Sequence, residues 1–252
     1  MAKEGGDSRG SISPAVHLSL QGKGGVGKSF IASVLAQYLR HKGRQVHCVD
    51  TDPVNQTFSQ YSTLQVCHLK LLNEGRIDPR AFDYLMERLL TEDGLFVVDN
   101  GASTFIPLWH YILENKVVSV LREAGRQLYV HSVITGGQSL IDTLSGFGEL
   151  AKTTPDRNVV VWVNEYFGSV QDNGKRFVEM RVFRENEEKV AGTVAIAKRS
   201  VDTFGRDVEE MLRRKLTFGE AIASPEFSIM ARQRLKMVQA GLFEQLDGLR
   251  LA

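Results

Sequence analysis

The chain has 252 residues, of which 42% are hydrophobic and 24% are charged, and 31 lysines and arginines stand against 30 acidic residues. This length and composition suit one larger globular domain or at most two small ones, and the net charge of +1 gives no support to nucleic-acid binding through bulk charge. Two cysteines are too few for a disulfide-stapled secreted scaffold, and no apolar run approaches the roughly 20 residues that cross a bilayer. We therefore expect a soluble, cytoplasmic protein with a core large enough to hold a site.

The two ends of the chain differ in pattern. Residues 1–14 are small and polar, without the apolar stretch of a signal peptide, and we expect them to form a flexible N-terminal tail. No linker or repeat divides the remainder, so residues 15–252 are predicted to form a single domain with a C-terminal helical segment. Apolar residues recur at helical spacing from Leu235 to Leu249, opposite a face that carries both acidic and basic residues. This mixed face favours docking on the protein body or on a partner over membrane binding.

β-branched apolar runs alternate with amphipathic helical patterns between these ends. In chain order, the predicted strands are Val16–Leu20, Val46–Asp50, Phe96–Asp99, Leu128–Ile134, Val159–Val163 and Val190–Ile196. The predicted helices are one that starts at Phe30 and stops before Gly43, and then Ala81–Leu90, Leu108–Leu121, Leu140–Ala151 and Val208–Leu216. This alternation predicts an α/β fold with a doubly wound, mainly parallel sheet flanked by helices. Ligands of such sheets bind at the carboxyl ends of the strands.

A glycine-rich segment joins the first predicted strand to the first predicted helix. Its residues fit the pattern G-x-x-x-x-G-K-[ST] and are Gly22, Lys23, Gly24, Gly25, Val26, Gly27, Lys28 and Ser29, followed by Phe30. Glycines allow the backbone to turn its N–H groups inward around an anion, and the N-terminus of the helix adds a partial positive charge. We predict that Lys28 lies along the β- and γ-phosphates and that Ser29 ligates Mg²⁺, as in a P-loop NTPase.

Two further predicted strands end in aspartates, at the edge of the sheet where the glycine-rich loop lies. Asp50 and Asp52 end or follow the second strand, and Asp99 ends the third. Mg²⁺ takes few protein ligands, and phosphoryl transfer to water needs a residue that orients the water. We predict Asp99 and Asp50 as carboxylates of the metal shell and Asp52 as the residue that positions the attacking water. Gly101 is predicted to let its N–H approach the γ-phosphate.

These segments resemble the ParA/MinD group of P-loop ATPases. The stretch from Lys23 to Ser29 resembles the deviant Walker A box of that group, Asp50–Pro53 resembles its switch I, and Val98–Gly101 resembles its switch II with the Walker B aspartate. The TraL-type branch, from plasmid conjugal-transfer operons, is similar over a longer span. The similar stretches are QGKGGVGKSFIASVLAQYL, DTDPVNQTF, VVDNGAS, VITGGQSLIDTLSGF and LTFGEAIA, which lie between Val16 and Ala223.

The resemblance implies a role for each matching residue. The match at Lys23 implies a lysine that crosses a dimer interface to the partner's nucleotide, and the match at Asp52 implies an aspartate needed for hydrolysis. Asn164, which follows the fifth predicted strand, matches an asparagine that contacts adenine. The implied cofactors are ATP or ADP with Mg²⁺, and the implied partners are a second copy in an ATP-bound homodimer and a plasmid transfer or partition protein. Basic clusters at residues 213–215 and 232–236 are compatible with nonspecific DNA contact or with solvated helix faces.

Two positions depart from the pattern of the group. Phe30 stands where a threonine or serine usually touches the α-phosphate, so only its backbone N–H is expected to serve there. Asn100 places an unusual polar side chain in switch II. Cys48 and Cys67 do not match the bridging cysteines of an iron–sulfur protein and are predicted to be small core residues. The six histidines show no metal-ligand spacing.

Three functions are compatible with the sequence. The first is a switch ATPase of plasmid conjugal transfer or maintenance, which binds Mg-ATP, dimerises and hydrolyses slowly under stimulation by a partner. The second is a nucleotide-loaded scaffold with negligible hydrolysis, which the residues at Phe30 and Asn100 favour. The third is a small-molecule kinase, which needs an acceptor pocket and usually a lid, and the sequence has no arginine-rich lid segment.

Overall fold

The computed structural model describes residues 14–249 and 251. The predicted N-terminal tail therefore lies outside the described residues, except for Pro14. The Pro14 carbonyl accepts a hydrogen bond from the Gln127 N–H at 3.0 Å, so the described chain is held to the sheet from its first residue.

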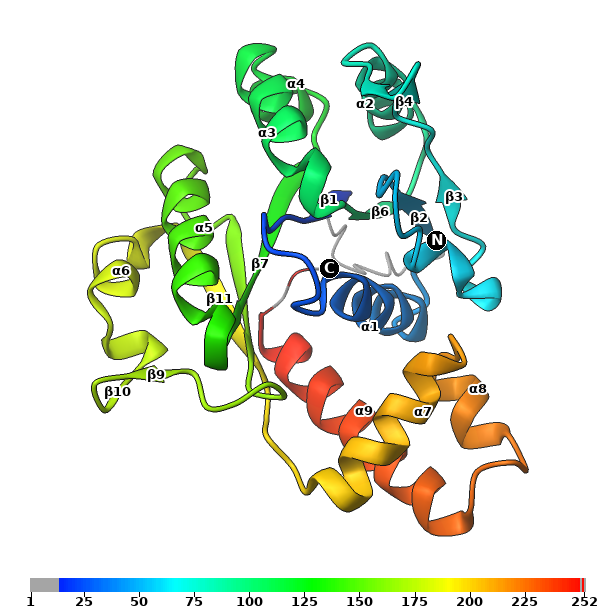
Figure 1. Ribbon diagram of the computed structural model, residues 1–252. Coiled ribbons are helices and arrows are strands. Elements are labelled where there is room, and N and C mark those ends of the chain that lie inside the picture. The colour runs from blue at the N-terminus through cyan, green and yellow to red at the C-terminus, as the bar shows by residue number, and fades with distance from the viewer. Residues whose placement is uncertain (1–13, 250, 252) are drawn as a thin grey trace, which may run out of the picture.

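Seven strands of the described chain form one sheet in the order β11-β8-β7-β1-β6-β2-β3, and every neighbouring pair is parallel (Figure 1). They are β1 (Ala15–Ser19), β2 (Val46–Asp50), β3 (Cys67–His68), β6 (Leu95–Asp99), β7 (Gln127–Thr135), β8 (Val159–Asn164) and β11 (Val190–Ile196). Two short hairpins lie apart from this sheet, β4–β5 (Leu72–Asn73 and Arg76–Ile77) and β9–β10 (Gln171–Asp172 and Lys175–Arg176). All six predicted strands are present, which confirms the expected parallel α/β architecture.

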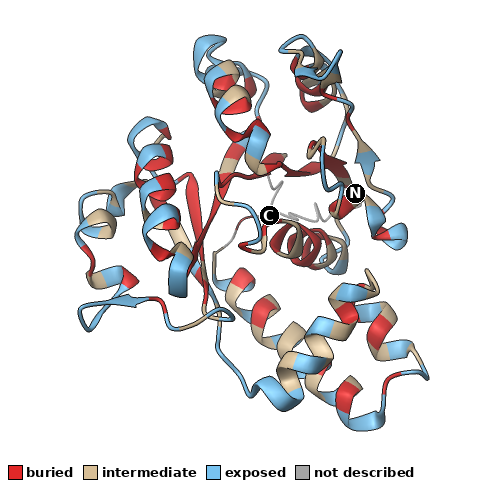
Figure 2. Cartoon of the chain, viewed as in Figure 1, coloured by how far each residue is buried: buried red, intermediate tan, exposed pale blue. Residues whose placement is uncertain are grey.

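Helices cover both faces of the sheet (Figure 1). On one face lie α1 (Lys28–His41), α7 (Arg206–Arg213), α8 (Phe218–Ala223) and α9 (Ile229–Leu249). On the other lie α2 (Ala81–Thr91), α3 (Phe105–Glu114), α4 (Val117–Glu123), α5 (Leu140–Thr153) and α6 (Arg181–Arg184). Because the sheet is covered on both sides, β6 is apolar up to its last residue and buried along its whole length (Figure 2). No helix of the described chain is long and apolar enough to cross a membrane.

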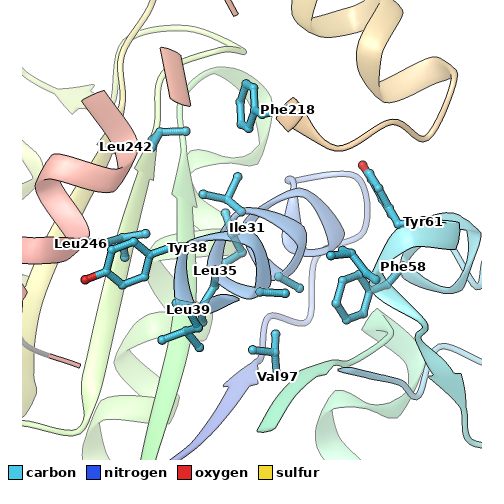
Figure 3. Packing of buried hydrophobic residues seen from close by; sticks show 14 of the residues in the cluster. Ile31, Leu35, Tyr38, Leu39, Phe58, Tyr61, Val97, Phe218, Leu242 and Leu246 are labelled. Carbon is cyan, nitrogen blue, oxygen red and sulfur yellow. The ribbon is translucent and has the colours of Figure 1, made fainter. Parts of the chain in front are cut away.

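The C-terminal helix α9 docks on the body of the protein, as the mixed polar face of this segment predicts. Its Leu242 and Leu246 belong to the same buried cluster as Leu35 and Tyr38 of α1 (Figure 3). Burying one leucine side chain stabilises a fold by roughly 1.5–3 kcal/mol, so this contact contributes substantially to the helix layer. The Tyr38 hydroxyl also donates a hydrogen bond to Asp247 at 2.8 Å, which joins the C-terminal ends of α1 and α9.

Two helices end earlier than the apolar pattern predicts. The single helix expected over residues 108–121 is divided into α3 and α4, because Lys116 takes a left-handed φ of 50° between them. The helix expected to run to Leu216 is α7, and it ends at Arg213, three residues earlier. There Lys215 is left-handed, with φ of 54°, and the Leu216 N–H bonds back to the Met211 carbonyl at 3.0 Å. The apolar periodicity continues through both turns, so it carries no signal of them.

Candidate nucleotide-binding site

The glycine-rich loop connects β1, the central strand of the sheet, to α1. Gly25 and Gly27 have φ angles of 74° and 105°, which residues with a Cβ rarely adopt. Gly27 is the N-cap of α1 and offers no side chain to the first turn, so the N–H groups of Lys28, Ser29 and Phe30 have no partner within the helix. These amides and the helix dipole make the loop a site for an anion.

The glycines of the loop are required for different reasons. A Cβ on Gly22 would lie 3.2 Å from Phe105 Cδ1, and a Cβ on Gly27 would lie 3.1 Å from Asn164 Nδ2. A Cβ on Gly24 would meet no atom within 4 Å, and the backbone there is not left-handed. The fold alone therefore does not require glycine at position 24, whereas close approach of a ligand to the backbone would.

The side chain of Gln21 anchors the start of the loop. It is buried, its Nε2 donates to the carbonyls of Val133 and Thr143 at 3.0 and 3.2 Å, and its Oε1 accepts from the Gly22 N–H at 2.9 Å. Helix α5 approaches this amide so closely that a Cβ on Gly146 would lie 2.2 Å from Gln21 Oε1. Sequence reasoning missed this role, although a polar residue directly after a buried strand is a signal of it.

Lys28 is buried in the loop that it follows. Its Nζ donates to the Lys23 carbonyl at 2.9 Å, so the ammonium folds back over the loop. Burial lowers the pKa of Lys28, and the charges of Asp99 and Asp52 oppose this effect by favouring the ammonium form. The structure thus brings together the predicted phosphate lysine and two of the three predicted carboxylates.

Asp99 is the carboxylate best placed to share a cation with Ser29. The pKa of Asp99 is raised to about 7, and the largest cause is burial. A hydrogen bond with the Ser29 side chain partly opposes this shift, and the nearby Asp50 charge adds to it. Asp99 Oδ1 is buried and has no hydrogen-bond partner among the described residues. No three His, Cys, Asp or Glu side chains gather into a metal centre within residues 14–249 and 251. A Mg²⁺ ion fits Ser29 and the unpaired Asp99 oxygen if phosphate supplies further ligands.

Asp50 and Asp52 organise the loop that follows β2. Both Asp50 oxygens are engaged, Oδ1 by the Asp52 N–H at 2.9 Å and Oδ2 by the N–H and hydroxyl of Ser59 at 2.9 and 3.0 Å. The Asp52 carboxylate accepts from the N–H groups of residues 54 and 55 and from the Asn55 side chain. Asp52 also packs against Gly101, where a Cβ would lie 2.7 Å from Asp52 Cγ. Both Asp50 oxygens therefore already have donors within this loop, and a metal role for Asp50 stays a prediction.

Asn164 lies at the end of β8 beside the loop, as the adenine-contact prediction requires. Its Nδ2 donates to the Val26 carbonyl at 3.0 Å, and its Oδ1 accepts from the Tyr166 N–H at 3.1 Å. A cavity of about 660 Å³ opens here, and its lining includes Gly27, Phe30, Asn164, Ile196, Arg199 and Leu242. The contact of Asn164 with a base stays a prediction, and the cavity gives a base room next to the loop.

The Lys23 side chain pairs with an acidic residue outside the predicted site. Its Nζ forms an ion pair with Asp142 Oδ2 of α5 at 2.8 Å, and the two side chains are 42% and 54% exposed. Asp142 was not a predicted site residue, because no sequence spacing links it to the loop. The exposed pair contributes at most about 1 kcal/mol, so it holds Lys23 only weakly.

Two other predictions concern cysteines and basic clusters. Cys48 is buried as predicted, but Cys67 is exposed, and its prediction as a core residue is wrong because β3 is a two-residue edge strand. In the basic clusters, Arg213 pairs with an acid on its own helix at 2.7 Å, and Arg214 and Arg234 also have acidic partners. These ion pairs offset part of the positive charge, and DNA contact stays a prediction.

Comparisons with known proteins identify the family of the chain. Residues 19–222 match the family described as the CobQ/CobB/MinD/ParA nucleotide binding domain. Two proteins named TraL from Escherichia coli are 46% and 45% identical over 233 residues, which cover 92% of this chain and 97% of each relative.

Solved structures show the same fold at low sequence identity. MinD from Aquifex aeolicus, a cell division protein, aligns with a TM-score of 0.52 at 15% identity, covering 94% of this chain and 97% of that one. The septum site-determining protein MinD from Pyrococcus horikoshii, solved with Mg-ADP, aligns with a TM-score of 0.53 at 14% identity, covering 95% and 99%. These likenesses establish the fold, and the matched residues and the relatives establish the family. The chain therefore belongs to the CobQ/CobB/MinD/ParA family of nucleotide-binding domains.

Proposed function

We propose that this protein is a nucleotide-dependent switch that binds Mg-ATP, associates with a second copy, hydrolyses ATP slowly and then separates. The observation that carries the proposal is the meeting of buried Lys28 with Ser29 and Asp99 at the N-terminus of α1. A buried ammonium, a row of helix N-terminal amides and a carboxylate with an unpaired oxygen suit a polyphosphate and its cation.

The residues of this chain supply positioning more than acid–base chemistry. Bound Mg²⁺ would neutralise phosphate charge, and Ser29 and Asp99 are the side chains placed to hold it. Lys28 would favour the negative charge of the β- and γ-phosphates, and Asp52 would orient the attacking water. Phosphoryl transfer needs little more from a protein than such positioning and charge stabilisation, so no strong general base is required.

Lys23 is the residue proposed to contact the nucleotide of a second subunit. It is partly exposed, and its ion pair with Asp142 is weak enough to be exchanged for a nucleotide phosphate. We propose that this exchange accompanies face-to-face association of two ATP-bound copies, in which each Lys23 reaches the nucleotide of the other. Breaking the exposed pair costs little, so the bound nucleotide decides which state is populated.

The proposed context is plasmid conjugal transfer or plasmid maintenance in the cytoplasm. The support for it is the identity of 46% with a TraL protein over most of the chain. A transfer or partition protein is the proposed partner that stimulates hydrolysis. Lys215 and Lys236, which form no ion pair among the residues that the structure describes, are the proposed points of nonspecific DNA contact.

A second candidate function is a nucleotide-loaded scaffold with negligible hydrolysis. The observation that favours it is the Asp52 carboxylate, which is engaged by three donors of its own loop and so has limited capacity to orient a water. Phe30 adds to this argument, because it has no hydroxyl to offer the α-phosphate. Phosphate release measured with and without transfer or partition proteins separates the two functions.

Three substitutions test the switch. We expect Lys28→Ala to abolish ATP binding, Lys23→Ala to bind ATP without forming dimers, and Asp52→Ala to form ATP-bound dimers without turnover. Calorimetry, light scattering and phosphate release measure these three steps. Lys42→Ala, at the other end of α1, is the control and should bind and hydrolyse ATP as the unmodified protein does, since this lysine contacts Asp247 on α9 and the Tyr38 ring, away from the glycine-rich loop. Equal ATPase activity in all four variants would contradict the proposal.

A further inference from the structure

A buried amide joins the two loops that carry Asp52 and Gly101. Asn100 follows β6 and is 1% exposed, and its Oδ1 accepts from the Thr51 hydroxyl at 2.9 Å and from the Thr104 hydroxyl at 2.8 Å. Thr51 belongs to the loop after β2, and Thr104 ends the short turn before α3. Both threonines are fully buried, and the Asn100 side-chain oxygen accepts from both, so it joins the loop after β2 to its own loop after β6.

The chemistry around Asn100 fixes which way the amide points. Its Nδ2 donates to the Gly101 carbonyl at 2.9 Å. The reversed amide would place its oxygen against that carbonyl oxygen, and two acceptors cannot bond each other. The oxygen therefore faces the two threonine hydroxyls. Each threonine hydroxyl has one proton and also lies 3.1 Å from a backbone carbonyl, that of Asp99 for Thr51 and that of Gly101 for Thr104, so the Asn100 oxygen is the nearer of two acceptors. For Thr51 both acceptors lie at the end of β6 or directly after it, so its hydroxyl joins the two loops in either case.

A second contact ties the same loops together. Gly101 lies so close to Asp52 that a Cβ would come within 2.7 Å of Asp52 Cγ, and the Thr51 N–H donates to the Asp99 carbonyl at 2.9 Å. If either loop is displaced, the hydrogen bond between Thr51 and Asn100 is stretched or the contact between Gly101 and Asp52 becomes a clash. The two loops are therefore expected to be displaced together.

We propose that Asn100 is a positioning residue that makes these two loops move as one unit. It is hydrogen-bonded to Thr51, Thr104 and Gly101, so it acts through its neighbours. A γ-phosphate that contacts one loop would thereby rearrange the other. The effect on turnover rests on the proposed function, whereas the mechanical link between the loops does not depend on it.

Hydrogen exchange of the nucleotide-free full chain tests the link itself. Thr51→Val and Thr104→Val each remove one hydroxyl and keep a similar shape. We expect either substitution to speed exchange in both loops, at residues 51–55 and 101–104, by roughly five- to tenfold, the change that one hydrogen bond of about 1 kcal/mol corresponds to. Thr154→Val, which removes a buried hydroxyl bonded to the Leu150 carbonyl, should leave both loops unchanged. Faster exchange confined to the loop that carries the substitution would overturn the proposal.

Steady-state kinetics test whether the link serves turnover. Thr51→Val should lower kcat roughly tenfold with KM nearly unchanged, and Thr51→Ser, which restores a hydroxyl, should recover most of kcat. The double variant Thr51→Val/Thr104→Val should lose no more than the worse single variant, because both break the same bridge. Losses that multiply, or a kcat unaffected by Thr51→Val, would overturn the role in turnover. An unmodified protein that does not hydrolyse ATP would instead contradict the proposed function, and the exchange experiment would still decide on the link.

Discussion

At the scale of single residues, Gly24 separates what the fold needs from what a ligand needs. Its backbone is not left-handed and an added Cβ meets no atom within 4 Å, so Gly24→Ala should change the free energy of unfolding by no more than about 0.5 kcal/mol. Next to a bound phosphate, however, the methyl group would occupy the space of the ligand. We expect nucleotide affinity to fall by tenfold or more, about 1.4 kcal/mol, which denaturation and calorimetry on the same sample can measure.

Gly219→Ala is the matched control for this prediction. Gly219 lies in α8, and an added Cβ there also meets nothing within 4 Å. Alanine should leave nucleotide affinity unchanged and should slightly stabilise the helix. If Gly24→Ala binds nucleotide as tightly as Gly219→Ala does, the loop does not approach a phosphate at this point.

At the scale of elements, the packing of α5 against the glycine-rich loop depends on a glycine in the helix. A Cβ on Gly146 would lie 2.2 Å from Gln21 Oε1, the amide that holds the Gly22 N–H. We expect Gly146→Ala to destabilise the protein by roughly 1–3 kcal/mol and to weaken nucleotide binding, because Gln21 must move. Gly148→Ala, on the same helix, meets only the end of the Val182 side chain at 3.2 Å.

The comparison of these two variants tests the packing argument. Alanine gains about 1 kcal/mol of helix propensity over glycine in both variants. In Gly148→Ala this gain offsets the crowding against Val182, so the free energy of unfolding should change little. Urea denaturation of the two proteins measures the difference. Similar stabilities for Gly146→Ala and Gly148→Ala would show that Gln21 adapts without cost and does not anchor the loop.

The elements that the sequence predicts well are those with a continuous physical pattern. The apolar run at Phe96–Asp99 lies within β6, and the run at Val159–Val163 lies within β8, because strands covered on both faces must be apolar throughout. The edge strand β3 and the hairpin β9–β10 have two residues per strand and mostly exposed side chains, so hydrophobic periodicity does not register them.

The candidate site shows the same division. The loop residues and Asp99 could be predicted because one short motif and the strand ends specify them. Gln21, Asp142 and Thr104 acquire their roles from contacts made in the folded chain. Gln21 bonds to groups 112 and 122 residues away, and no spacing in a single sequence records such a contact. Asn100 departs from the pattern of the family in the sequence, but its function as a shared acceptor depends on where the loop after β2 places Thr51.

At the scale of the whole molecule, the centre of the sheet contains a buried polar cluster. Trp162 Nε1 donates to His131 Nδ1 at 2.9 Å, and His131 Nε2 lies 3.0 Å from His17 Nδ1. Because the indole can only donate, His131 carries its proton on Nε2 and donates it to His17. The remaining proton of His17 is on Nε2, which is buried without a partner among the described residues. Both imidazoles are neutral, since burial lowers the pKa of His17 to about 3 and the pKa of His131 well below its usual value.

This cluster makes the stability of the entire fold sensitive to mild acid. Below about pH 6.5 the unfolded chain protonates both histidines, while the folded chain keeps them neutral down to about pH 3 for His17, so protons stabilise the unfolded state. The two histidines should therefore lower the free energy of unfolding as pH falls from 6.5 to 5, by up to about 1.4 kcal/mol per pH unit each, while Asp99, whose pKa is raised to about 7 in the folded chain, opposes them by up to the share of one histidine. His17→Gln keeps an acceptor for His131 and should reduce this slope by the share of one histidine, whereas His110→Gln, at an exposed position, is the control substitution. Denaturant unfolding at several pH values measures the slope, and equal slopes in the unmodified protein and His17→Gln would show that His17 takes up its proton without unfolding.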